Sequence, residues 1–386
     1  MSRKLLTYDD FRLAAKRALP RPMFDYIDGG ADDEVTLRGN TDAFRAYELV
    51  PEALRNITDV DVSTTVLGAK MAAPVILSPT GMNRLFHHDK ELAVARAAEE
   101  AGLMYSLSTL GTTSMEDIAG VKPGPKMFQI YIHKDRGLTR EFVARAKASG
   151  YDALCLTVDV PTAGNRERDL RSGLMMPPKF TLSSLFSFVS HPKWSLNLLL
   201  NPEFQLANVA HRQDGLADGT MGVIAYINSQ IDGAISWDDA AEVIEAWGGP
   251  FAIKGLSSVS DARRALDVGA SAVIISNHGG RQMDGAVAPI DCVAPMRDAV
   301  GDAMELIVDG GVRRGTHVLK ALAMGANAVS FGRPYLYGLA SGGQKGVARV
   351  LELFLKELKR DMMLLGCRNL SEIRPDHIRQ TMRVGR

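Results

Sequence analysis

A short stretch of mixed chemistry stands out in the chain, the run Ser-Asn-His-Gly-Gly-Arg at residues 276–281. It combines a hydroxyl, an amide, an imidazole and a guanidinium, groups that move protons and hold anions. The residues before it, 272–276, form an apolar, β-branched run that is typical of a buried parallel strand. Polar groups at the carboxyl end of such a strand are where sheets and barrels bind ligands. We therefore predict that His278 is a base and that Arg281 binds an anion.

Seven further apolar segments have the same organisation and alternate with helix-like segments at roughly 20 to 30 residue spacing, with one long interruption. Eight such units predict an α/β fold, a (β/α)8 TIM barrel over residues 74–360. The barrel belongs to one domain of residues 1–386 and follows an N-terminal extension, residues 1–70, which begins with a helix from Thr7 to Leu19. The predicted strands are 74–81, 104–109, 127–132, 153–159, 251–256, 272–278, 304–311 and 327–334.

Almost every predicted strand ends in a side chain that is able to hold a ligand. Any one of these residues alone is more simply a strand-end cap or a turn. In a closed barrel, however, the strand ends converge on one face, which predicts a single polar site. The residues are Thr80, Ser108, Gln129, Tyr131, Thr157, Asp159, Lys254, Ser276, His278, Asp309, Gly332 and Arg333.

The last two strands predict a phosphate site, because they run into the sequences VDGGVRRG and FGRP. Glycines let the backbone approach a ligand, and amides at a helix start bind anions. Arg313 and Arg333 would complete the site; the alternative is two tight turns with solvated arginines. The Gly-x-Gly-x-x-Gly fingerprint is absent, which disfavours a Rossmann dinucleotide fold.

Composition excludes several classes of protein. The 386 residues carry 45 basic and 45 acidic side chains, and this balance argues against nucleic acid as the main partner. The three cysteines are far apart and form no CxxC pattern, so we predict no metal site and a reduced thiol at Cys155 within an apolar run. Asp9 and Asp10 interrupt the basic start before a signal peptide can form, and no window reaches the roughly 18 apolar residues of a spanning helix.

Six motifs together, SNHGGRQ, DGGVRRG, FGRP, FQIYIHKDR, LTVDVP and SPTG, resemble the FMN-dependent L-2-hydroxy acid oxidases and dehydrogenases. The resemblance runs from about Tyr26 to the last helix. Its pattern is most similar to membrane-associated (S)-mandelate dehydrogenase and L-lactate dehydrogenase. It implies FMN as cofactor, a (β/α)8 barrel and a homotetramer.

The same resemblance implies roles for individual residues. Asp159 would stabilise the imidazolium of His278, while Arg166 and Arg281 would bind the substrate carboxylate. Lys254 would offset negative charge on the flavin. Tyr26, Tyr131, Gly81 and Leu110 would contact substrate, with Leu110 leaving room for a larger side chain. Flavin ring or ribityl contacts would come from Thr80, Ser108, Gln129, Thr157, Lys254 and Ser276, and ribityl or phosphate contacts from Asp309, Gly311, Arg313, Gly332 and Arg333.

About ninety residues separate the fourth and fifth predicted strands, and their first part, 174–215, is apolar with a few basic residues. A lid or a subunit interface is one interpretation. An interfacial membrane segment is the interpretation we favour, because HPKW followed by an apolar run resembles the quinone-linked dehydrogenases. We therefore predict a peripheral protein on the cytoplasmic face of the inner membrane that passes electrons from a 2-hydroxy acid to a quinone. The alternatives are a cytoplasmic oxidase that uses O2 and, more distantly, a flavin-dependent isomerase.

Overall fold

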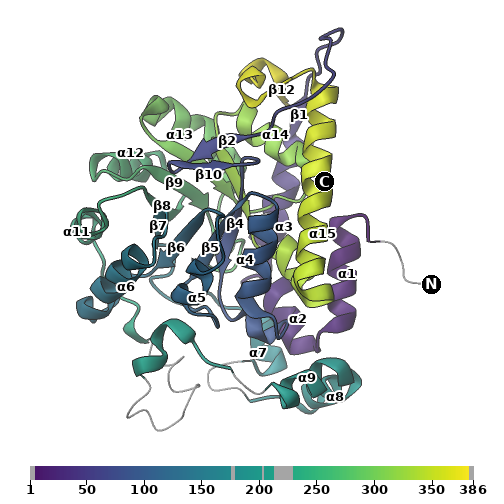
Figure 1. Cartoon of the computed structure of the whole chain (residues 1–386), viewed down its shortest axis with the longest axis vertical. Coiled ribbons are helices and arrows are strands. Elements are labelled where there is room, and N and C mark those ends of the chain that lie inside the picture. The colour runs from purple at the N-terminus through teal and green to yellow at the C-terminus, as the bar shows by residue number, and fades with distance from the viewer. Residues whose placement is uncertain (1–4, 175–178, 202–203, 213–228, 382–386) are drawn as a thin grey trace.

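A closed barrel of eight parallel strands forms the centre of the structure (Figure 1). The computed structural model describes residues 5–174, 179–201, 204–212 and 229–381. Neighbouring strands follow chain order, and the barrel closes where β11 pairs with β4. The predicted (β/α)8 fold is confirmed. The barrel strands are β4 (Val75–Thr80), β5 (Met104–Ser108), β6 (Lys126–Ile130), β7 (Ala153–Thr157), β8 (Phe251–Leu256), β9 (Ala272–Ser276), β10 (Glu305–Asp309) and β11 (Ala328–Phe331).

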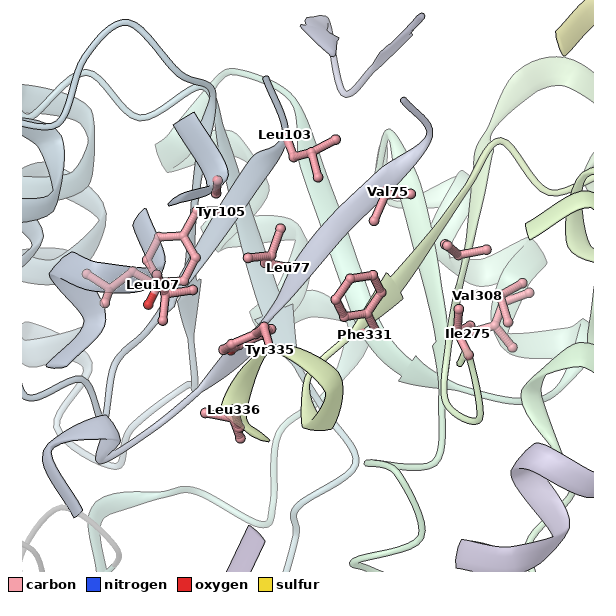
Figure 2. Packing of buried hydrophobic residues seen from close by; sticks show 14 of the residues in the cluster. Val75, Leu77, Leu103, Tyr105, Leu107, Ile275, Val308, Phe331, Tyr335 and Leu336 are labelled. Atoms are coloured by element: carbon pink, nitrogen blue, oxygen red, sulfur yellow. The ribbon is translucent and has the colours of Figure 1, made fainter. Parts of the chain in front are cut away.

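Two sets of alternating side chains explain why these segments read as continuous apolar runs. One set packs inside the barrel and includes Ile76, Met104 and Cys155. The other set points outward against the helices, and Figure 2 shows two of its members, Leu77 and Phe331. Strands that are buried on both faces are apolar at most positions. Burial raises the pKa of the Cys155 thiol to about 12, as expected for a reduced core cysteine.

Helices surround the barrel and bury one side each. The longest, α15 (Arg333–Leu365), breaks its helical conformation at Gly342 and Gly343 and packs against α1 and α4. The others are α4 (Lys90–Glu100), α5 (Met115–Ala119), α6 (Arg136–Ala148), α11 (Trp237–Trp247), α12 (Val259–Asp267), α13 (Val293–Val300) and α14 (Gly315–Ala323).

The N-terminal extension packs beside the barrel and closes its amino end. Its first helix, α1 (Tyr8–Ala18), is capped by Thr7, whose hydroxyl accepts from the Asp10 amide as the sequence predicts. The hairpin β2 (Thr64–Val66) and β3 (Ala69–Met71) joins the interior apolar cluster and so covers that end. The remaining elements are α2 (Arg21–Asp28), α3 (Val35–Asp42) and the strand pair β1 (Tyr47–Leu49) with β12 (Ile378–Gln380).

The apolar insertion forms short helices at the opposite, carboxyl end of the barrel, where Figure 1 shows α8 and α9 standing out from its body. The helices of the insertion are α8 (Leu182–Ser190) and α9 (Pro192–Leu200), followed by a 3-10 segment, Ala207–Arg212. Just before the insertion lies α7 (Glu167–Ser172). Part of the predicted insertion lies outside the described residues. Among the helices that the structure describes, none is long and apolar enough to cross a membrane.

Candidate active site

A cavity of about 1090 Å³ opens at the carboxyl ends of the barrel strands and reaches under α8 and α9. Most of the predicted site residues line it, from nearly every strand end and from the N-terminal extension. These are Tyr26, Thr80, Gly81, Ser108, Leu110, Tyr131, Arg166, Lys254, His278, Arg281, Asp309, Gly311, Arg313, Gly332 and Arg333.

Four predicted residues do not line this cavity but lie behind it. Gln129 accepts a hydrogen bond from Ser108 at 3.1 Å, and Asp159 contacts His278. Ser276 lies between Lys254 and Asp309. Thr157 borders a second, much smaller cavity. A local sequence pattern places such residues at strand ends but does not say which of them face the ligand space.

A left-handed turn presents the His278 side chain to the cavity. His278, Gly279 and Gly280 have φ angles of 57°, 64° and 73°. The His278 amide donates to Ser276 Oγ at 3.0 Å, which holds the non-glycine residue in this conformation. Strained backbone of this kind persists where surrounding contacts fix it, and it is enriched at functional sites. The turn directs the imidazole away from the strand.

The imidazole of His278 pairs with a buried carboxylate. Nδ1 lies 2.9 Å from Asp159 Oδ1, which leaves Nε2 as the ring nitrogen for a ligand. Burial on its own raises the pKa of Asp159, but the charges of His278 and Lys254 outweigh it and hold that pKa below its ordinary value. The carboxylate is therefore charged at neutral pH and lies directly beside the imidazole ring.

Two half-buried arginines flank one tyrosine ring. The guanidinium carbons of Arg166 and Arg281 lie 5.1 and 4.8 Å from the Tyr26 ring centroid. Arg281 donates to the backbone carbonyl of Tyr26, while Arg166 pairs with Asp169 at 3.2 Å. Burial and the neighbouring Arg166 lower the pKa of Arg281 to about 10, so it remains a cation. Two neighbouring cations, of which only Arg166 is ion-paired with a carboxylate among the described residues, make this part of the wall receptive to an anion.

A buried ion pair crosses the barrel centre. Lys254 Nζ lies 3.2 Å from Asp309 Oδ2 and donates to Ser276 Oγ at 3.0 Å. Burial lowers the pKa of this lysine, but the charges of Asp309 and Asp159 outweigh it, so the pKa is raised and the amine stays charged. The pair continues to two hydroxyls that sequence reasoning missed, Ser78 and Ser330, with Ser78 donating to Asp309 at 2.7 Å. Ser78 lies inside SPTG and Ser330 inside VSFGRP, so the strand-end signal was present for both.

The glycine-rich loop after β10 approaches the N-terminal extension too closely for any side chain. A Cβ on Gly311 would lie 2.0 Å from the Asn40 carbonyl oxygen, and its φ is 78°. Asn40 in turn exchanges side-chain hydrogen bonds with Asn277, a pair that the sequence did not reveal. Arg313 lines the cavity with its guanidinium carbon 4.5 Å from the Tyr8 ring centroid.

Arg333 is oriented by backbone groups. It donates to the carbonyls of Ile27, Gly29 and Gly279 at 2.8–2.9 Å and so joins the N-terminal extension to the turn after β9. Burial lowers the pKa of its guanidinium. The side chain that the sequence assigns to phosphate therefore also fixes the position of the site's own wall.

Comparisons with known proteins agree with this geometry. The family described as FMN-dependent dehydrogenase matches residues 15–380. The chain belongs to the FMN-dependent dehydrogenase family. Among relatives, an L-lactate oxidase of Nostoc sp. is 42% identical over 368 residues, covering 94% of this chain and 95% of the relative. A protein of Mycobacterium tuberculosis named putative L-lactate dehydrogenase is 39% identical over 381 residues, covering 98% and 90%.

Solved structures of the same family are similar over the whole chain. A monotopic membrane protein, (S)-mandelate dehydrogenase, superimposes with a TM-score of 0.93 at 34% identity and covers 98% of this chain and 100% of that one. A mandelate oxidase superimposes with a TM-score of 0.83 at 36% identity, covering 97% and 98%. The predicted family and its FMN cofactor are thus confirmed.

The residues present fit FMN. The cavity is lined by the hydroxyl-bearing residues Ser78, Thr80 and Ser108 together with the Lys254 cation. It is also lined by Gly311, where a Cβ would clash with Asn40, and by Arg313. A flavin ring with hydrogen-bonding edges, a hydroxylated chain and a phosphate need partners of these kinds.

Proposed function

We propose that this FMN-dependent dehydrogenase oxidises an L-(S)-2-hydroxy acid, mandelate-like or lactate-like, to the 2-oxo acid and passes the electrons to a membrane quinone. The observation that carries the oxidation is the pairing of His278 with Asp159 on the same cavity as Arg166 and Arg281. A base and an anion clamp side by side are what a 2-hydroxy acid requires. The relatives named for lactate and mandelate support the substrate class.

The substrate carboxylate would lie between the guanidinium groups of Arg166 and Arg281. Tyr131 would donate a hydrogen bond to the substrate, because burial raises its phenol pKa and keeps the proton on the oxygen. Tyr26, which lies between the two arginines, would donate a hydrogen bond to the substrate from the opposite side. These contacts would orient the hydroxyl-bearing carbon before reaction.

His278 Nε2 would remove a proton as the substrate loses an electron pair, and Asp159 would stabilise the imidazolium that forms. His278 has this role whether the Cα–H bond breaks by proton or by hydride loss. Bound FMN supplies the acceptor for the electron pair. Lys254, held charged by Asp309, would offset the negative charge that reaches the barrel centre.

The membrane assignment is supported by an exposed apolar face on the insertion. Leu182, Phe186 and Val189 on α8 are 74–86% exposed, and Leu196, Leu199 and Leu200 on α9 are also exposed. Exposed Lys179 and Lys193 flank them, as in interfacial helices at anionic lipid. The monotopic description of (S)-mandelate dehydrogenase supports peripheral membrane association, and the place we propose is the cytoplasmic face of the inner membrane. A homotetramer is expected from the family, and sedimentation velocity would measure the oligomeric state.

A soluble oxidase that forms hydrogen peroxide is the second candidate, favoured by the relative named L-lactate oxidase. Anaerobic stopped-flow reduction of the holoenzyme by L-mandelate and L-lactate, followed by mixing with oxygenated buffer or with a soluble quinone, distinguishes the two. We expect fast flavin bleaching and fast reoxidation by quinone alone. Fast reoxidation by oxygen would establish the oxidase, and no bleaching by either acid would refute the proposed oxidation.

Membrane association is tested by flotation with liposomes that contain anionic lipid. Phe186→Glu places a charge on the apolar face and is expected to abolish flotation while flavin reduction continues. Leu54→Glu is the matched control, since Leu54 is an exposed leucine outside the insertion. Equal flotation of both variants and the wild type would assign the insertion to a lid or interface instead.

A further inference from the structure

The cavity has a second part that the chemistry described above does not use. Around His278 and Arg281 its wall is charged, whereas under α8 and α9 it is apolar and aromatic. Phe188 and Trp194 are stacked there, with centroids 5.5 Å apart and planes 26° apart. Trp194 Nε1 donates to the Leu85 carbonyl, which fixes the indole against the barrel. This part therefore offers a flat apolar surface to a planar ring.

This apolar part reaches the exposed face of the insertion. Leu185 and Leu199 line the cavity and are nevertheless 49% and 76% exposed. They lie on α8 and α9, the helices that also carry Leu182 and Phe186 on the exposed apolar face. A molecule dissolved in a bilayer beneath that face would enter the cavity without crossing water.

One charged side chain stands in the apolar part of the wall, Arg84, which is 2% exposed. It donates to the carbonyls of Asn197 and Asn201 at the end of α9, but its Nε has no hydrogen-bond partner in the described chain. Within the same described residues it forms no ion pair, and burial lowers its pKa. A buried cation without an anion favours a ligand that supplies an oxygen acceptor.

We propose that the apolar part of the cavity binds the ring of the quinone acceptor, with a ring oxygen hydrogen-bonded by Arg84 and the tail leaving between Leu185 and Leu199. This proposal rests on the proposed function and states where its electron acceptor binds. The net reaction balances: the hydroxy acid loses two electrons and two protons and becomes the 2-oxo acid, and the quinone gains both and becomes the quinol. Arg84 stabilises the oxygen on which negative charge develops.

Calorimetric titration of the detergent-solubilised holoenzyme with ubiquinone-1 tests the site directly. Arg84→Met keeps the apolar stem but removes the donors, and we expect about a tenfold weaker Kd, the size of one hydrogen bond to a charged group. Arg84→Lys keeps the charge and is expected to recover part of the affinity. Equal affinity of wild type and Arg84→Met would overturn the role of Arg84.

A second pair of variants tests the opening and leaves the Arg84 side chain in place. Leu199→Trp narrows the opening and is expected to weaken ubiquinone-1 binding, whereas Leu182→Trp, on the same exposed face but off the cavity wall, is expected to bind as the wild type. Identical binding of both variants and the wild type would overturn the route.

A competition experiment shows whether the quinone or the substrate side chain occupies the apolar part of the cavity. Saturating 2-hydroxyoctanoate is expected to leave ubiquinone-1 binding unchanged; displacement would assign the apolar part to substrate and overturn the proposal. Anaerobic bleaching of the flavin by a 2-hydroxy acid is scored separately. Its failure would refute the proposed oxidation, while bleaching with no ubiquinone-1 binding would refute only the acceptor site.

Discussion

The carboxylate of Asp159 lies against the imidazole of His278. One oxygen contacts Nδ1 of the imidazole, and the second is buried without a hydrogen bond from the described residues. The pKa of this carboxyl is held below its ordinary value, so it carries a full charge next to the ring. A charge that is already in place costs no reorganisation when the imidazole becomes protonated.

Asp159→Asn should therefore slow flavin reduction while FMN binding is retained. The amide keeps the shape but loses the charge, and we expect roughly a hundredfold lower rate, within the range of general-base effects. Anaerobic stopped-flow across pH 6 to 9 measures this, with Asp267→Asn on the exposed end of α12 as the matched control. A rate equal to that of the control would remove Asp159 from the reaction.

Among the elements, the turn after β9 joins the barrel to the N-terminal extension. The Ala31 amide donates to the Gly280 carbonyl at 2.8 Å, and a Cβ on Gly280 would lie 2.6 Å from the Leu37 amide nitrogen. The glycine is thus required by its φ angle and by the close approach of α3. The turn that carries His278 is therefore packed directly against the extension.

Gly280→Ala and Gly285→Ala separate these two requirements. Both glycines have positive φ, 73° and 77°, but a Cβ on Gly285 meets open space. We expect Gly285→Ala to lower the free energy of unfolding by about 1 kcal/mol from backbone strain alone, and Gly280→Ala by about 2 kcal/mol more. Denaturant unfolding of the holoenzyme measures both. Equal losses would show that the α3 contact is unimportant.

At the scale of the whole molecule, one buried carboxylate links four segments that are far apart in the sequence. Asp28 at the end of α2 accepts from Arg12, Arg168 and Tyr337, which lie on α1, α7 and α15. Burial alone raises the pKa of Asp28, but these donors outweigh it and lower the pKa to about 2. The ion pairs thereby fix the extension that supplies Tyr26 to the cavity.

Buried His133 makes the stability of the molecule depend on pH. Burial lowers its pKa from 6.5 to about 4, so the unfolded chain binds the proton first. The contribution of neutral His133 to the free energy of unfolding is complete above pH 6.5. It is lost progressively as the pH falls from 6.5 to 4, by up to about 3 kcal/mol. His133→Phe should flatten the dependence of the unfolding free energy on pH in that window. Parallel curves for the two proteins between pH 7.5 and 4.5 would contradict this.

The sequence by itself determined the barrel and the composition of its site. Each strand is short, mostly apolar and has a polar residue at or near its carboxyl end, a pattern that is typical of a strand buried on both faces. The eight strands, the Thr7 cap and the buried thiol of Cys155 were therefore predictable from local residues. The motif SNHGGRQ predicts site roles for His278 and Arg281 because their chemistry is concentrated in one short stretch, and both residues line the cavity.

Only the tertiary structure decided which of these residues meet. Asp159 reaches His278 across 119 positions, and Tyr26 comes between Arg166 and Arg281 from a separate extension. Gln129, Thr157 and Ser276 have the same strand-end signal as their neighbours but lie behind the cavity wall, and Arg84 had no signal in the sequence. The reason is physical: side-chain direction and burial depend on barrel closure and on the packing of distant segments, which no local pattern encodes.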